Sequence, residues 1–350
     1  MGENLFVGMA KGLRTWLESN HFLPIVTDVF LMLLAVVGVL GFLFLNALFL
    51  IYYDRKFGAW VQARLGPNRV GPRGIFQTVA DTLKLFAKEI FIPNNVDRWP
   101  YLLAPVLIFT IPVMLFLVIP FGKGMVPYDL NLGVLYLVAV TSVETIVLWM
   151  AGWSSNNKYS LLGAMRSVAQ MLSYEMPVIF AMLSVVMMAG SMKLSDIVAA
   201  QQKVWFIFLQ PVGFLIYFIA VNAEFKRTPF DLVEGESEII SGPYTEYSGM
   251  NFALFFLAEY TNFMIGAIMV TTLFLGGWNA PFGWTFIPSW LWFIIKMYFV
   301  ITLYMWTRWT FLRIRIDQML NFAWKFLLPV SLVNIFVTGV GLYLYRMIRW

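Results

Sequence analysis

Five ionisable side chains lie within long apolar stretches of the sequence, where an isolated charge is costly. They are four glutamates, Glu144, Glu175, Glu224 and Glu259, and one lysine, Lys296. An ionised side chain at the centre of a bilayer costs about 2.5–3.5 kcal/mol even on insertion scales. These side chains should therefore face protein or water, where a carboxyl can take up and release protons. We expect a proton relay; the alternative for each residue is a helix-packing ion pair or a side chain that reaches the interface.

The segments that carry these residues are predicted to be transmembrane helices. Hydrophobic residues make up 60% of the chain and charged residues 12%, and the mean hydropathy is +0.76, outside the usual range of soluble domains. The apolar residues occur in blocks of roughly 20, without the alternation of a β-barrel strand. We predict an all-α polytopic membrane protein, one domain over 1–350. Its eight expected spans lie at about 27–51, 100–119, 133–153, 161–189, 204–225, 250–276, 289–310 and 325–345.

The distribution of basic residues predicts how these spans are oriented. The connections on one side of the membrane (52–99, 154–166, 226–249 and 308–325) carry 16 Lys and Arg, whereas the other connections and both tails carry 7. Lys and Arg accumulate in cytoplasmic loops. We therefore expect the large loops in the cytoplasm and both termini on the outer side. Residues 1–24 are expected to form an amphipathic helix that lies on the membrane surface.

The residues that the chain lacks exclude several kinds of chemistry. It has no cysteine and a single histidine, His21. Iron–sulfur clusters therefore have no cysteine ligands here, and one imidazole cannot form a haem pair or a histidine-based metal site. The sequence also contains no glycine-rich phosphate loop and no nucleophile elbow. We expect no metal, no bound cofactor and no redox chemistry of the chain's own, and its net charge of +5 reflects topology rather than a nucleic-acid partner.

Two of the predicted cytoplasmic loops combine charge with apolar residues or tight turns. The acidic loop, 226–249, interleaves its carboxylates with apolar residues, so we expect it to fold against the protein and to line a hydrated cleft rather than to be a solvated loop. Its acids are Asp231, Glu234, Glu236, Glu238 and Glu246. The first cytoplasmic loop, 52–99, contains a Gly/Pro-rich run that forces a defined turn. That turn favours contact with another subunit over simple binding to lipid headgroups.

The sequence resembles a known family, the H subunits of NADH-quinone oxidoreductase (respiratory complex I), whose mitochondrial counterpart is NADH dehydrogenase subunit 1. The matching motifs occur in the family's order over nearly the whole chain. They are RLGPNRVGP at 64–72, ADTLKLFAKE at 80–89, AGWSSNNKYSLLGAMR at 151–166, SYE at 173–175, RTPFDLVEGESEIISG at 227–242, TEYSGM at 245–250, AEYTN at 258–262, LGGW at 275–278 and RIRIDQ at 313–318.

The resemblance implies a subunit of the bacterial inner membrane, at the junction of the membrane arm and the cytoplasmic redox arm. Quinone, either ubiquinone or menaquinone, would be the substrate, and the other complex I subunits would bind NADH, FMN and iron–sulfur clusters. The residues that the family's motifs place at the quinone chamber are Arg55, Arg64, Asp81, Lys84, Arg227, Phe230 and Arg308. Glu175, Glu224 and Glu259 would belong to the chain of acids that leads from this chamber toward the antiporter-like subunits, and Glu144 would be a likelier member of that chain than Lys296.

Some positions depart from the family's pattern. Asp54 stands in place of a glutamate, Lys226 in place of an asparagine, and Leu312 and Ile316 in place of a proline and a tyrosine. Three other functions also fit parts of the pattern: the homologous subunit of an energy-converting hydrogenase or ferredoxin-linked complex, a stand-alone ion transporter, and a purely structural anchor. The motif at 66–69 and the full set of acids favour the quinone enzyme.

Overall fold

The computed structural model describes residues 24–348, apart from Glu234, Phe282, Gly283 and Thr285, together with Gly12, Arg14, Thr15 and Ser19. Helices and loops account for all of this described part, which contains no β-strand. The predicted all-α class is therefore confirmed. The surface helix expected over 1–24 falls almost entirely outside the described residues, and so does His21.

Seven helices in the described part are long and apolar enough to cross a membrane. They are α2 (Pro24–Val61), α4 (Arg98–Leu115), α5 (Gly133–Ser154), α6 (Lys158–Ala189), α11 (Gly249–Phe274), α12 (Ser289–Thr310) and a C-terminal helix made of α13 (Ile316–Phe322), a π-helical turn (Ala323–Leu327) and α14 (Leu328–Ile348). Seven of the eight expected spans are thus confirmed as membrane-length helices, and α2 extends about a turn or more beyond both predicted ends.

The remaining expected span, 204–225, is broken into two helices. The four residues of α8 (Phe206–Leu209) are followed by α9 (Pro211–Glu224). Pro211 has no backbone N–H and cannot continue the hydrogen-bond pattern of the preceding turn. The side chain of Gln210 stabilises the break: its amide donates to Thr338 at 2.5 Å and its carbonyl accepts from Ser184 at 2.6 Å. At about 1.5 Å per residue, α9 spans only about 21 Å, less than a full hydrocarbon core.

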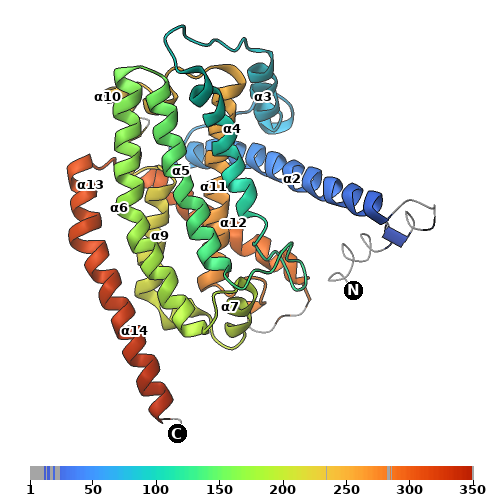
Figure 1. Cartoon of the computed structure of the whole chain (residues 1–350), viewed down its shortest axis with the longest axis vertical. Coiled ribbons are helices and arrows are strands. Elements are labelled where there is room, and N and C mark those ends of the chain that lie inside the picture. Colours follow the sequence, from blue (N-terminus) through green and yellow to red (C-terminus); the bar gives the residue numbers. More distant parts are fainter. Residues whose placement is uncertain are drawn as a thin grey trace.

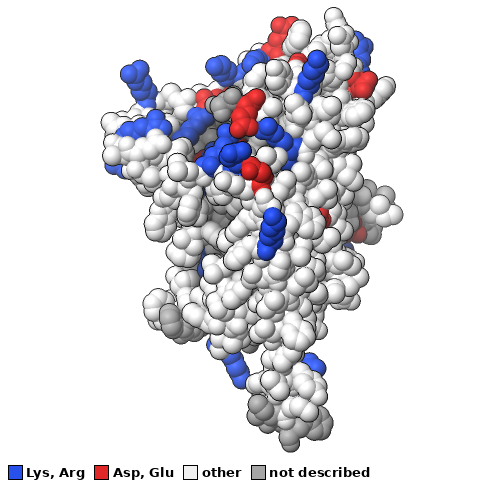
Figure 2. All heavy atoms as spheres, turned by 90° about the vertical axis from the view of Figure 1, so that its left-hand side faces the viewer, with Lys and Arg blue, Asp and Glu red and all other residues white. Residues whose placement is uncertain are grey.

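The connections alternate between the two ends of the bundle (Figure 1). One end carries η2 (Pro72–Gly74), α3 (Gln77–Ala87), α10 (Glu236–Ile239) and η3 (Gly242–Tyr244), and the opposite end carries α7 (Leu194–Ala200). On the face drawn in Figure 2, Lys and Arg gather toward the end with α3 and α10, which agrees with the predicted grouping of the basic loops. We call this the loop end; its orientation toward the cytoplasm stays a prediction.

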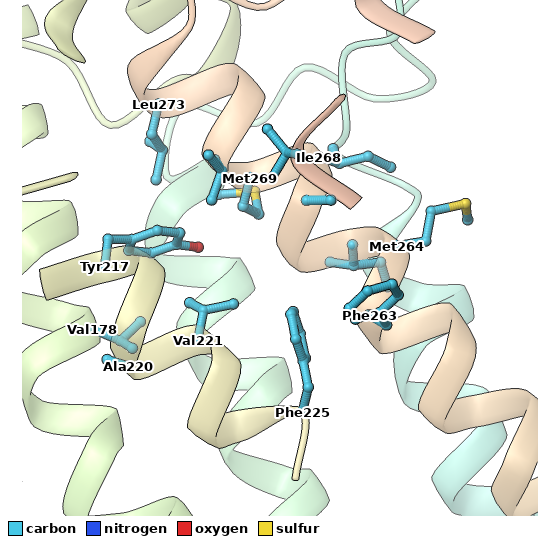
Figure 3. Packing of buried hydrophobic residues seen from close by; sticks show 14 of the residues in the cluster. Val178, Tyr217, Ala220, Val221, Phe225, Phe263, Met264, Ile268, Met269 and Leu273 are labelled. Carbon is cyan, nitrogen blue, oxygen red and sulfur yellow. The ribbon is translucent and has the colours of Figure 1, made fainter. Parts of the chain in front are cut away.

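Among the membrane-length helices, α6 and α11 are the most buried, and α9 packs against α6. In Figure 1, α2 extends obliquely out of the bundle on one side, and α13 and α14 lie along its opposite side. Figure 3 shows Tyr217, Val221 and Phe225 of the α9 region facing α11. The ring of Phe225 lies directly against Gly266, where a Cβ would come within 1.8 Å of its Cζ. Gly266 therefore allows α9 to end close against α11, and this brings the residues after Glu224 into the bundle core.

Candidate functional site

A cavity of about 60 Å³ lies between α5, α6, α9 and α11. Three carboxylates reach its wall: Glu144 from α5, Glu175 from α6 and Glu224 from α9. Most of the remaining wall is apolar, with the hydroxyl of Tyr217 and the amide of Asn262 among the exceptions. Because roughly 10–15 Å³ of such space is enough to hold one water, the cavity has room for water.

The three carboxylates have different partners. Glu144 accepts a hydrogen bond from Asn262 at 2.7 Å and forms an ion pair with Lys226 at 3.1 Å. Glu175 accepts a short hydrogen bond from the hydroxyl of Ser142. Within the described part of the chain, the carboxylate of Glu224 has neither a hydrogen-bond donor nor a cation within 4.0 Å. Buried polar groups generally have a hydrogen-bond partner, so we expect water beside Glu224 in the cavity.

A second buried cluster joins the ends of α2, α11 and α12. Asp54 accepts hydrogen bonds from Tyr260 at 3.2 Å and from the indole of Trp309 at 3.0 Å, and it forms a short ion pair with Arg308. Arg227 lies 3.7 Å from the same carboxylate. We call Asp54, Arg227, Glu259, Tyr260 and Arg308 the arginine cluster.

Arg227 is the centre of the arginine cluster. Its Nε lies 2.8 Å from Glu259, and its guanidinium stacks 4.4 Å from the ring centre of Tyr260. Only 7% of its side chain is exposed, whereas 28% of the Arg308 side chain is exposed, so Arg308 is the open side of the cluster. The buried Nη2 of Arg227 and the hydroxyl of Tyr304 have no hydrogen-bond partner among the described residues. Both donors line the cluster, in a space too small to admit a water molecule.

The acidic loop folds back onto the helix ends, as its interleaved apolar residues predict. Phe230 is buried and packs edge-on against Tyr174 at 5.3 Å. Asp231 lies 3.4 Å from Arg313, and burial raises the pKa of Asp231 while Arg313 opposes that shift. Asp231 therefore contacts a specific basic residue at the helix ends.

Two further acids fix the ends of this loop. Glu238 pairs with Arg166 of α6 at 2.5 Å, and that hydrogen bond lowers the pKa of Glu238. Glu246 accepts from Asn157 at 2.5 Å, just before α6 begins. Glu234 and the side chain of Glu236, which the sequence also places on this loop, lie outside what the structure describes.

The predicted chamber residues of the first loop are separate from both buried clusters. Arg55 forms an ion pair with Asp81 at 2.6 Å, which ties the end of α2 to α3, and both side chains are at least a third exposed. The side chains of Arg64 and Lys84 are exposed at the loop end. These four residues therefore form an outer surface beside the arginine cluster instead of extending it.

Lys296 lies apart from the glutamates, at the end of the bundle that carries α7. Its ammonium group donates to the carbonyls of Leu275, Gly277 and Asn279 at 2.7, 3.0 and 2.6 Å, and it sits 4.4 Å from the ring centre of Trp205. These carbonyls follow the last turn of α11, where unpaired acceptors are expected. The position of Lys296 thus favours a cap on α11.

Several residues of the site were not singled out by sequence reasoning as functional. Asp54 and Lys226 stood out only as departures from the family's pattern, and Ser142, Tyr260 and Asn262 were not selected individually. A usable signal existed for the last two, because they lie one and three positions after Glu259 in an apolar segment. Polar residues that share such a segment with an acid are natural hydrogen-bond partners for other buried carboxylates.

The comparisons with known proteins agree with this architecture. The family model described as NADH dehydrogenase matches residues 34–339. The H subunit of NADH-quinone oxidoreductase from Carboxydothermus hydrogenoformans is 97% identical over 350 residues, the full length of both chains. The proteins of the same name from Bacillus cereus (strain B4264) and Bacillus mycoides are each 49% identical over 311 residues, covering 89% of this chain and 92% of theirs. The chain therefore belongs to the NADH dehydrogenase family.

Proposed function

We propose that this chain is the membrane subunit of a proton-translocating NADH-quinone oxidoreductase, in which it contributes to the quinone chamber and to the proton path. Its relatives carry the name of that enzyme, which favours it over an energy-converting hydrogenase or a stand-alone transporter. Because the chain has no cysteine, the iron–sulfur clusters belong to partner subunits. We assign the binding of NADH and FMN to partner subunits as well. The chain lies in the bacterial inner membrane with the loop end toward the cytoplasm and both termini outside.

The observation that carries this proposal is the adjacency of the two buried sites. Lys226 and Arg227 are consecutive, yet Lys226 pairs with Glu144 at the cavity and Arg227 pairs with Glu259 in the arginine cluster. A change of charge at the cluster therefore changes the electrostatic potential at the cavity. At an effective dielectric constant of about 20, a unit charge roughly 10 Å away changes an interaction by about 1.7 kcal/mol. That is more than tenfold in proton affinity.

The reaction itself assigns roles to these groups. Reduction of a quinone to a quinol takes up two electrons from the partner subunits and two protons. Negative charge that develops on the quinone oxygens is stabilised by the open side of the arginine cluster, at Arg308. The predicted surface residues Arg55, Arg64, Asp81 and Lys84 lie where the quinone enters, and Phe230 packs beneath it.

Protons move through the carboxylates around the cavity. Glu175 and Glu224 have no ion-pair partner in the described part of the chain, so they are free to change protonation. Glu259 lies in the arginine cluster, 2.8 Å from Nε of Arg227, and is the member of the predicted relay on that side. Lys296 is the weakest member of the predicted relay, because its three hydrogen bonds go to backbone carbonyls.

A photoreactive quinone analogue tests the quinone assignment in the assembled complex. We expect light-dependent labelling of peptides that contain 54–64, 227–230 or Arg308, and we expect excess unlabelled quinone to prevent it. The control is an apolar probe that carries the same photoreactive group without the quinone ring. Labelling by both probes at the same lipid-facing positions, or labelling confined to other subunits, would contradict the proposal.

A further inference from the structure

Lys226 is a buried cation that pairs with Glu144, one of the three acids that line the cavity. We propose that Lys226 keeps Glu144 permanently ionised, so that Glu144 acts as a fixed anion and the transferable protons reside on Glu175 and Glu224. This inference rests on the proposed function of the cavity in proton transfer. It assigns Lys226 as a positioning residue and divides the three carboxylates into one structural anion and two carriers.

The hydrogen bonds of Glu144 favour its charged form. One oxygen faces the ammonium group of Lys226 at 3.1 Å and the other accepts from the amide nitrogen of Asn262 at 2.7 Å. Both neighbours donate, and an ammonium group has no acceptor to offer. A proton on Glu144 would therefore displace one of these donors. By contrast, Glu175 has one neutral donor, Ser142, and Glu224 has no donor among the described residues.

Burial makes the pair behave as one unit. The side chain of Lys226 is 7% exposed and that of Glu144 is 10% exposed. If Glu144 were protonated while Lys226 stayed charged, a buried cation would be left without compensation, which is strongly unfavourable. The titratable groups facing the pair across the cavity are Glu175, Glu224 and Tyr217, none of which could replace the charge of Glu144 without becoming a fixed anion itself.

The backbone supplies an independent reason to regard Lys226 as selected for its charge. Its φ of 56° lies in the left-handed region, which lysine adopts rarely and glycine or asparagine more readily. The turn is held from both sides by Gln170, whose amide donates to the carbonyls of Ala223 at 2.7 Å and Phe230 at 2.8 Å. Such strain persists where the surroundings fix it, and it concentrates at functional sites. The ion pair with Glu144 explains why a lysine occupies this position.

Infrared difference spectroscopy of the assembled complex, oxidised against quinone-reduced, tests the assignment through the carbonyl stretch of protonated carboxylic acids. With Lys226 present, Glu144→Gln is expected to remove no such band, whereas Glu224→Gln removes one. Lys226→Met is expected to create a new band that disappears in the double variant Lys226→Met, Glu144→Gln. Loss of a protonated-carboxyl band on Glu144→Gln alone, or no new band in Lys226→Met, would overturn the inference.

Two further variants separate charge from folding. Lys226→Asn suits the backbone conformation but removes the charge, so it should reproduce the band of Lys226→Met; Lys226→Arg keeps the charge and should show none. If Lys226→Asn shows no new band although the complex assembles, backbone conformation and not charge explains the residue. The proposed function fails separately, namely if Glu175→Gln and Glu224→Gln both leave proton translocation unchanged, whatever the infrared bands show.

Discussion

Asp54 is the carboxylate on which the arginine cluster depends, and its replacement by asparagine is expected to destabilise the chain strongly. Only 4% of Asp54 is exposed. It contacts Tyr260 at 3.2 Å, Trp309 at 3.0 Å and Arg227 at 3.7 Å, and it forms a short ion pair with Arg308. Asparagine occupies the same volume, so the substitution removes a charge without creating a cavity.

The expected magnitude follows from the charge balance of the cluster. Two guanidinium groups, Arg227 and Arg308, face two carboxylates, Asp54 and Glu259. Asp54→Asn leaves one buried positive charge uncompensated, and breaking a buried pair in this way costs about 3–5 kcal/mol. At about 1.4 kcal/mol per factor of ten, the ratio of folded to unfolded protein falls by roughly two to four orders of magnitude.

The assay is the thermal stability of the assembled complex, together with the amount of this chain that assembles in membranes. Asp81→Asn is the matched control, because its partner Arg55 lies 2.6 Å away but their side chains are 37% and 48% exposed. An exposed pair contributes only about 0–1 kcal/mol. The double variant Asp54→Asn, Arg308→Gln restores the charge balance and should recover part of the loss. Equal effects of Asp54→Asn and Asp81→Asn, with no recovery in the double variant, would refute the reasoning.

Three further predictions concern the acidic loop and the opposite end of the bundle. Gly163→Ala should detach the loop from α6 and increase its cleavage by protease, because the new Cβ would lie 2.4 Å from Gly242 Cα; Gly341→Ala, with nothing within 4 Å, is the control. Docking of the loop through Glu238 should be complete above the ordinary pKa of a glutamate and lost as pH falls through the lowered pKa. Cleavage of the loop by protease should therefore increase at acid pH, and Glu238→Gln should remove this pH dependence. Lys296→Met should lower the thermal stability of the complex, because three carbonyls, two of them buried, lose their donor; an unchanged transition would contradict the capping role.

Much of the fold could be predicted because lipid imposes a simple pattern on the sequence. Apolar blocks of membrane length predicted the helices, and the distribution of Lys and Arg predicted which loops lie at the same end of the bundle. The break at Gln210 could not be read in this way, because 204–225 is continuously apolar apart from Gln210, Pro211, Asn222 and Glu224. The side-chain bonds that stabilise the break come from Ser184 and Thr338, on helices distant in sequence.

The acidic residues of the site could be predicted from the sequence, whereas their ion-pair partners could not. The cost of burying charge identified Glu144, Glu175 and Glu224, which the structure brings to one cavity. The pairs Lys226–Glu144 and Arg308–Asp54 join residues 82 and 254 positions apart, so only the tertiary structure shows them. Lys296 carries the same sequence signal as the glutamates, a charge in an apolar span, yet its partners are carbonyls at the end of α11. Sequence alone does not distinguish a capping lysine from one that belongs to a relay.

Proton movement through buried carboxylates of this chain during quinone reduction is the core of the proposed function. Its sharpest test is the number of protons translocated per quinone reduced, measured in sealed vesicles that contain the complete complex with Glu224→Gln. Glu89→Gln, which changes an exposed glutamate at the loop end, is the matched control. We expect the ratio to fall severalfold in Glu224→Gln, or both activities to fall together because they are tightly coupled, while Glu89→Gln matches the unaltered complex. Normal quinone reduction with an undiminished proton ratio in Glu224→Gln would contradict the proposed proton path.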